Sequence, residues 1–267
     1  MSRLATHEYW EERYQQDPEP FDWLQRYSTC REFREAVKKQ LRPADTTLVV
    51  GAGSSRLPEE LFADGHTKLT AIDWSSTCVS QLKERYARSQ NLKIETAVMD
   101  ARSMDFNDGS FDACIDKALL DAVLCGGDDA AQESARKLLT EIARVCKASE
   151  SVFLLVSIEP PDVRLPLLKR PEFNWKVTSH PIAKPTSSLT AVAIAPASEP
   201  AAPDARPDAC CAAAFDFFDV LFSSLPSLAL QARSSRAPSR TVRLPLLTRC
   251  APSRGLPAAG LLVRGAP

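Results

Sequence analysis

The sequence predicts an α/β fold with a doubly wound, mostly parallel sheet, and three observations carry that prediction. Between residues 47 and 158, five short apolar runs alternate with segments of helical periodicity. The first run, Thr47–Val50, ends in a Gly-x-Gly turn at Gly51 and Gly53. The second run ends at Asp73, 22 residues beyond Gly51. Strands that alternate with helices at this spacing pair in parallel, because each helix carries the chain back across one face of the sheet.

Residues 1–45 are predicted to form a helical cap around an aromatic cluster. Trp10 and Tyr14 lie four residues apart, and so do Trp23 and Tyr27. Residues at this spacing share a helix face, so two short helices are expected. The rings have two interpretations. They are ordinary core packing of the cap, or they contact a positively charged ligand, because aromatic faces attract cations.

The main domain is predicted to span residues 46–195, with its elements in regular order. Residues 151–158 are almost all apolar, which is typical of a central parallel strand buried on both faces. Residues 173–179 alternate like a sixth strand, and residues 189–195 make a weak seventh. The remaining predicted strands are 47–50, 68–72, 92–98 and 111–116, and the predicted helices are 32–40, 57–65, 76–86, 117–124 and 132–145.

The chain changes composition near residue 186. Up to that point it holds 25 Lys and Arg against 29 Asp and Glu, whereas from Ser187 onward 8 Arg face 5 acidic residues. No lysine follows Lys184, and 11 of the 20 prolines come after it. Residues 196–267 are rich in Ala, Pro, Ser and Arg and show no sustained period, so they are expected to form a disordered C-terminal extension.

Composition also limits the partners and the compartment. Neither part of the chain is basic enough to predict nucleic-acid binding. The eight cysteines lack the paired short spacing of a zinc site, and Cys114 and Cys146 lie in apolar runs, as buried thiols of a reducing compartment do. The charged amino terminus carries no secretory signal, and no apolar run reaches membrane-spanning length. A cytoplasmic protein without metal, nucleic-acid or membrane partners is expected.

The turn after the first strand carries the functional prediction. Only glycine lets backbone N–H groups approach a ligand closely at such a turn, and an acid in the position of Asp73 meets a pair of ribose hydroxyls in doubly wound folds. Arg56 stands where a dinucleotide fingerprint has its third glycine. The turn therefore favours an adenosine ligand without a diphosphate, of which S-adenosylmethionine is the common example. An ordinary tight turn and a nicotinamide cofactor are the alternatives.

Further candidates stand at the carboxyl ends of the third and fourth strands, where open α/β sheets bind ligands. Asp100 ends the third strand, where it could accept a hydrogen bond from an adenine amino group or be a surface aspartate. Asp116 ends the fourth strand and Lys117 begins the helix that follows, so both are expected over the pocket. Asp116 could equally cap the helix that follows.

Several short motifs span about residues 8–158. Together with five β/α units, they resemble the class I S-adenosylmethionine-dependent methyltransferases, specifically the methyltransferase-like family that contains lysine methyltransferases of translation elongation factor 1-alpha. The resemblance implies a Rossmann-like methyltransferase domain with a seven-stranded-type sheet. The motifs are Glu8-Tyr9-Trp10-Glu11-Glu12-Arg13-Tyr14, Phe21-Asp22-Trp23, Val50-Gly51-Ala52-Gly53-Ser54-Ser55, Ile72-Asp73-Trp74-Ser75-Ser76, Met99-Asp100-Ala101, Phe111-Asp112 and Asp116-Lys117-Ala118-Leu119-Leu120-Asp121-Ala122.

The same resemblance implies S-adenosyl-L-methionine as cofactor and a set of residues that contact it. Ala118 and Leu119 replace a Gly-Thr pair of the family, which leaves the identity of the substrate open. The implied contacts are Trp10, Tyr14 and Trp23 beside the cofactor, Gly51 at its amino-acid end with Gly53 in the same turn, Asp73 and Trp74 at the ribose and adenine, Asp100 and Ala101 at the base, and Lys117 closing the pocket.

The expected reaction is methylation of a protein lysine, with elongation factor 1-alpha as the substrate that the resemblance implies. Methyl transfer from a sulfonium needs positioning rather than a dedicated nucleophile. The acceptor lysine must be neutral, and desolvation lowers its pKa. Asp116 or Asp121 could orient the amine or take its proton. The alternatives are methylation of a small molecule or another protein residue, and a cofactor-binding module without catalysis.

Overall fold

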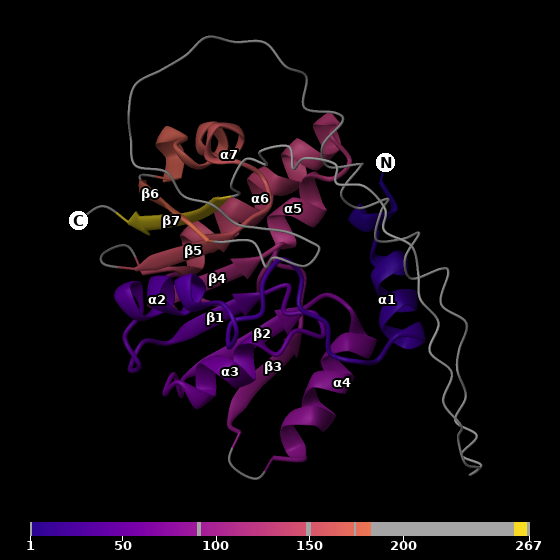
Figure 1. Cartoon of the computed structure of the whole chain (residues 1–267). Coiled ribbons are helices and arrows are strands. Elements are labelled where there is room, and N and C mark those ends of the chain that lie inside the picture. The colour runs from indigo at the N-terminus through magenta and orange to yellow at the C-terminus, as the bar shows by residue number, and fades with distance from the viewer. Residues whose placement is uncertain (1, 90–91, 148–150, 174, 183–258, 266–267) are drawn as a thin grey trace, which may run out of the picture. The chain divides into compact units, whose positions relative to one another are not determined.

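The computed structural model describes residues 2–89, 92–147, 151–173, 175–182 and 259–265. Within these residues the strands form one sheet in the order β3-β2-β1-β4-β5-β7-β6 (Figure 1). The strands are β1 (Thr47–Val50), β2 (Leu69–Asp73), β3 (Ile94–Val98), β4 (Ala113–Lys117), β5 (Val152–Val156), β6 (Trp175–Pro181) and β7 (Ala259–Gly265). The helices are η1 (Arg3–Ala5), α1 (His7–Gln16), α2 (Arg31–Gln40), α3 (Leu57–Ala63), α4 (Ser76–Ala87), α5 (Leu119–Leu124), α6 (Asp129–Val145), α7 (Pro161–Leu168) and η2 (Pro171–Phe173).

The parallel part of the sheet confirms the predicted fold class. β1 pairs in parallel with β2 and β4, β3 extends the sheet beyond β2, and β5 extends it beyond β4. Every residue of β1, β4 and β5 is buried, as the unbroken apolar runs predict. β3 stands at the edge and is partly exposed. Because all five strands run the same way, their carboxyl ends meet at one edge of the sheet.

The main core lies between the sheet and α6. Successive side chains of a strand point to opposite faces, so Leu48 and Val50 share one face of β1. These two residues belong to a buried cluster with Leu138 and Ile142 of α6 and Phe153 of β5. The predicted amphipathic helix over residues 132–145 is confirmed, although it begins three residues earlier, at Asp129. The side chain of Asp128 accepts a hydrogen bond from the Ala131 N–H and caps the start of α6.

The amino-terminal region contains one expected element and one difference. α1 places Trp10 and Tyr14 on its buried face, as their spacing predicts. The expected helix through Trp23 and Tyr27 is wrong, because residues 17–30 contain no helix. Leu24 has a φ of +65°, which an α-helix of L-residues does not allow. The conformation of this segment is determined by its side-chain contacts with other elements and not by its own periodicity.

The carboxyl-terminal part of the sheet was predicted incompletely. β6 confirms the sixth strand, and the weak seventh at residues 189–195 lies outside the described residues. The expected disorder lies outside them too, except for Ala259–Gly265, where it is wrong. This segment forms β7, antiparallel to both β5 and β6. Its short apolar run satisfies the backbone groups along the free edge of β5, a pairing too distant in sequence to leave a local pattern.

α7 was also missed. The two prolines at residues 160 and 161 predict only the end of a strand, but a proline in the first turn of a helix costs nothing because its missing N–H has no partner there in any case. Among the described residues, no helix combines the length and the apolar character that crossing a membrane requires.

Candidate ligand site at the glycine turn

The turn between β1 and α3 requires glycine at two positions. Gly51 and Gly53 both have a φ of +55°, in the left-handed region that other residues rarely adopt. A Cβ on Gly51 would lie 2.9 Å from Cδ1 of Leu119, and a Cβ on Gly53 would lie 2.9 Å from the hydroxyl of Tyr14. The turn therefore has the backbone geometry predicted for close approach of a ligand, with a side chain packed against each glycine.

Asp73, at the end of β2, is tied directly to this turn. Its Oδ2 accepts a hydrogen bond from the Gly53 N–H at 2.9 Å, and its Oδ1 accepts one from the Ser75 N–H at 3.0 Å. The residue is 5% exposed, and burial raises the pKa of its carboxyl to about 6. Since a carboxylate offers about four acceptor positions, these two bonds leave it able to accept ligand hydroxyls.

The predicted aromatic residues of the cap gather beside the turn. The Trp10 and Tyr14 rings are stacked with centroids 5.8 Å apart, and the Trp23 ring meets Trp10 edge-on at 6.2 Å. Trp10 donates its indole N–H to the Leu4 carbonyl at 2.7 Å, which fixes the orientation of the ring. Because the Tyr14 hydroxyl packs on Gly53, these rings form a wall that reaches the glycine turn.

Tyr27 does not belong to this wall. Its ring packs edge-on against Phe33 of α2 with centroids 5.3 Å apart, and its hydroxyl donates to Asp64 at 2.9 Å. Tyr27 is 1% exposed. It is an ordinary core residue of the cap.

A second group of predicted residues lies at the ends of β2 and β3. The Met99 N–H donates to the Asp73 carbonyl at 2.9 Å and joins the two strand ends. Asp100 accepts from Nη2 of Arg102 at 2.8 Å and from the Arg102 backbone N–H at 2.9 Å. The Arg102 guanidinium also lies over the Trp74 ring, 5.0 Å from its centroid. Burial opposes ionisation of Asp100, but the bonds from Arg102 outweigh it and lower the pKa of that carboxyl. Ala101 is buried in the main core.

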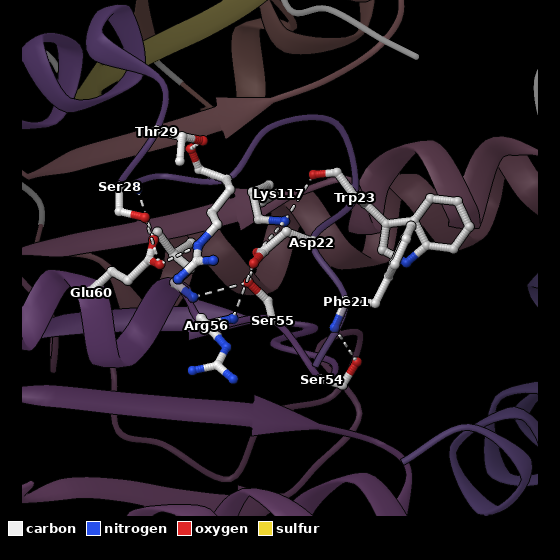
Figure 2. Close-up of polar contacts among 12 residues, drawn as sticks. Phe21, Asp22, Trp23, Ser28, Thr29, Ser54, Ser55, Arg56, Glu60 and Lys117 are labelled. Atoms are coloured by element: carbon white, nitrogen blue, oxygen red, sulfur yellow. Dashed lines mark hydrogen bonds and ion pairs between the residues drawn. The ribbon is translucent and has the colours of Figure 1, made fainter. Parts of the chain in front are cut away.

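Lys117, at the end of β4, reaches the segment that the aromatic cap contributes (Figure 2). Its Nζ lies 3.3 Å from Oδ1 of Asp22 and donates to the Trp23 carbonyl at 3.0 Å. Its side chain is 4% exposed, and burial lowers the pKa of its ammonium. The structure therefore places Lys117 beside the aromatic wall, where its ammonium is bonded to Asp22 and to the Trp23 carbonyl.

Asp116 caps α5, as one of its two interpretations predicted. Its Oδ1 accepts from the Leu119 N–H at 2.8 Å and its Oδ2 from the Leu120 N–H at 3.1 Å. The residue is fully buried, and burial, together with the nearby charge of Asp121, raises the pKa of Asp116 to about 8. Ala118 precedes the helix with a φ of +72°.

Asp121 belongs to a buried ion pair. Its Oδ1 accepts from Nη2 of Arg164 at 2.6 Å and from the Ser157 hydroxyl at 2.5 Å, and its Oδ2 accepts from the Ile158 N–H at 3.0 Å. Asp121 is fully buried and Arg164 is 4% exposed. Both carboxylates that were predicted as catalytic candidates thus hold the polypeptide together: Asp116 starts α5, and Asp121 joins α5 to β5 and α7.

Comparison with known proteins decides the family. The family description of a methyltransferase domain matches residues 48–154. The EEF1A lysine methyltransferase 4 of Bos taurus is 37% identical over 161 residues, which cover 57% of this chain and 61% of that protein. The protein of the same name in Mus musculus is 32% identical over 178 residues, which cover 64% of this chain and 68% of that protein. The chain belongs to this family of class I S-adenosylmethionine-dependent methyltransferases.

This membership confirms the family that the motifs predicted. The chain spans about three fifths of the length of the bovine relative. A solved SAM-dependent methyltransferase from Methanosarcina mazei is 26% identical, with a TM-score of 0.41, over 51% of this chain and 62% of that chain.

Three polar residues with defined partners in the structure were not assigned a role from the sequence. Asp22 lies inside the Phe-Asp-Trp motif, which singled it out without indicating its partner. Arg102 follows Asp100 by two residues, a spacing that allows a local ion pair. Arg164 has no local signal, because its partner Asp121 lies 43 residues away.

Proposed function

We propose that this protein is a protein-lysine methyltransferase that uses S-adenosyl-L-methionine and modifies translation elongation factor 1-alpha in the cytoplasm. The relatives named as EEF1A lysine methyltransferases support the substrate. The single observation that carries the cofactor assignment is the contact of the Asp73 carboxylate with the Gly53 N–H, because it ties the predicted ribose-binding acid to the turn.

The residues around the turn fit an adenosyl sulfonium. In this proposal, Asp73 accepts the ribose hydroxyls through its remaining lone pairs, and Trp74 with Asp100 borders the adenine. The Tyr14 hydroxyl packs on Gly53, whose N–H is bonded to the buried Asp73 carboxylate, and the Trp10 ring stacks on Tyr14. Aromatic rings and a carboxylate both favour a positively charged ligand. When bound, S-adenosylmethionine supplies an activated methyl group.

The contribution of the protein to methyl transfer is mainly positioning. Placing an amine in line with a methyl donor converts an encounter of two molecules into a single oriented step. The lysine must lose its proton before it attacks, although its ordinary pKa is about 10.4. Burial disfavours the charged amine, so an apolar channel promotes that loss. Asp116 and Asp121 are already bonded to backbone N–H groups and, in the case of Asp121, to Arg164, so the proposal gives neither of them the proton.

The test combines binding with transfer. Calorimetry compares S-adenosylmethionine with NAD on the purified chain, and tritiated methyl transfer is then measured on purified elongation factor 1-alpha and on a cell lysate. The expected results are that S-adenosylmethionine binds and NAD does not, and that a lysine of elongation factor 1-alpha becomes labelled. Label in another protein or in small molecules would overturn the substrate. Binding without any transfer would favour a cofactor-binding module without catalysis. The observation that favours this alternative is that Leu119, which replaces a residue of the family's Gly-Thr pair, packs on Gly51.

A further inference from the structure

The segment of residues 20–28, here called the strap, forms neither a helix nor a strand and lies beside the residues that lead into α3 (Figure 2). It carries Trp23 to the edge of the Trp10 ring. Since no helix or sheet ladder holds it, its position depends on individual contacts with the rest of the protein.

One end of the strap is fastened to α3. Glu60 accepts from the Ser28 N–H at 2.8 Å, from the Ser28 hydroxyl at 2.8 Å and from Nε of Arg26 at 2.6 Å. At the other end, the Phe21 N–H donates to the Ser54 hydroxyl at 3.1 Å. These contacts fix the two ends and leave the centre, at Asp22 and Trp23, to be held separately.

The centre of the strap is held by the charged side chain of Lys117 and by the residues after the glycine turn. Asp22 accepts from the Ser55 hydroxyl and from the Arg56 N–H, both of which follow the glycine turn. Its Oδ1 also lies 3.3 Å from Nζ of Lys117 at the end of β4. The side chains of Asp22 and Lys117 are 11% and 4% exposed. A buried ammonium or carboxylate is costly without its partner, so each of these residues depends on the other.

The second bond of Lys117 falls on a strained point of the strap. The Trp23 carbonyl accepts from the Gln25 N–H at 2.8 Å and from Nζ of Lys117 at 3.0 Å. The first of these bonds closes a three-residue turn around Leu24, whose φ of +65° is unfavourable for a residue with a side chain. Such backbone strain persists only where surrounding contacts hold it, and Lys117 supplies one at the carbonyl that closes the turn.

We propose that Asp22 and Lys117 form a latch that keeps the strap, and with it Trp23, closed against the glycine turn. The proposal rests on the methyltransferase function, because the ligand that the closed strap retains is the cofactor. Both are positioning residues: Lys117 acts through Asp22 and the Trp23 carbonyl, and Asp22 acts through Lys117 and the residues after Gly53. The resemblance alone implied a direct contact of Lys117 with the cofactor, and gave Asp22 no role.

The test uses Asp22→Asn, Lys117→Met and the double variant of the full chain. Glu133→Gln and Arg136→Met are the matched controls, because they remove the same charges from an ion pair on α6 with a separation of 2.7 Å. Two readouts are followed: the rate of tryptic cleavage after Arg26, which lies inside the strap, and the dissociation rate of S-adenosylhomocysteine measured by tryptophan fluorescence.

The latch predicts that each single variant raises both rates about tenfold, as expected for loss of a hydrogen bond to a charged group. The double variant should be no faster than the faster single variant, because either change opens the same contact. Asp22→Asn preserves the shape of the side chain, so it decides the test if Lys117→Met does not fold.

Two outcomes would overturn the latch. In one, both rates of the Asp22 and Lys117 variants equal those of the α6 controls. In the other, Lys117→Met accelerates dissociation but Asp22→Asn does not and strap cleavage is unchanged, which means that Lys117 touches the cofactor directly. If the unmodified chain binds no S-adenosylhomocysteine, the proposed function fails, whereas tryptic cleavage still decides whether Asp22 and Lys117 hold the strap.

Discussion

Replacing Gly53 by alanine tests the contact between the aromatic cap and the glycine turn. The left-handed backbone costs alanine about 1 to 2 kcal/mol relative to glycine, and about 0.4 to 1 kcal/mol of this is offset because alanine restricts the unfolded chain. The added Cβ would lie 2.9 Å from the Tyr14 hydroxyl, so Tyr14 must shift, which costs a further amount of about 1 to 3 kcal/mol. The total expected loss of unfolding free energy is about 3 kcal/mol, within a range of about 1 to 5 kcal/mol.

Gly109→Ala is the control for this experiment. Gly109 has a similar φ of +64°, but the nearest atom to its added Cβ is 3.8 Å away. Its loss should therefore contain only the backbone cost, about 1 kcal/mol. Both variants are unfolded in urea without cofactor. In a Tyr14→Phe background the closest ring atom is 3.9 Å from the Cβ, so Gly53→Ala should fall to the cost of the control.

Equal losses for Gly53→Ala and Gly109→Ala would falsify the reasoning. So would a loss at Gly53 that Tyr14→Phe leaves unchanged. Either result would mean that Tyr14 does not pack on the turn, and the aromatic wall would lose its connection to the candidate ligand site.

Three further predictions concern single carboxylates. Because burial raises the folded-state pKa of Asp73 to about 6, this carboxyl gains a proton as the pH falls through that value. Calorimetry should therefore show weaker binding of S-adenosylhomocysteine below about pH 6 than above it. In Asp73→Asn the affinity should not change with pH over this range. Arg164→Met leaves the Asp121 carboxylate buried without its charged partner, which should lower the free energy of unfolding in urea by about 3 to 5 kcal/mol. Adding Asp121→Asn should recover part of this stability. An unchanged urea midpoint in the single variant would refute the ion pair. Asp116→Ala removes the cap of α5 and should cost about 1 kcal/mol, whereas Asp116→Asn, which keeps an acceptor oxygen, should cost less; equal losses measured by thermal unfolding would contradict the cap.

Local patterns were sufficient where a segment and its partners lie close in sequence. The five parallel strands, the glycine turn and α6 follow from apolar periodicity and from positions that only glycine can occupy. The same patterns predicted that Trp10 and Tyr14 share one face of α1 and that Asp73 ends its strand near the turn.

The sequence by itself therefore determined the parallel sheet, the glycine turn and the family, because those features depend on short-range periodicity and on motif spacing. Only the tertiary structure decided what the charged groups do. Lys117 meets Asp22, 95 positions earlier, and Arg164 meets Asp121, while β7, from beyond residue 258, pairs between β5 and β6. A buried charge is satisfied by whichever partner the fold brings close, and local sequence holds no record of that partner.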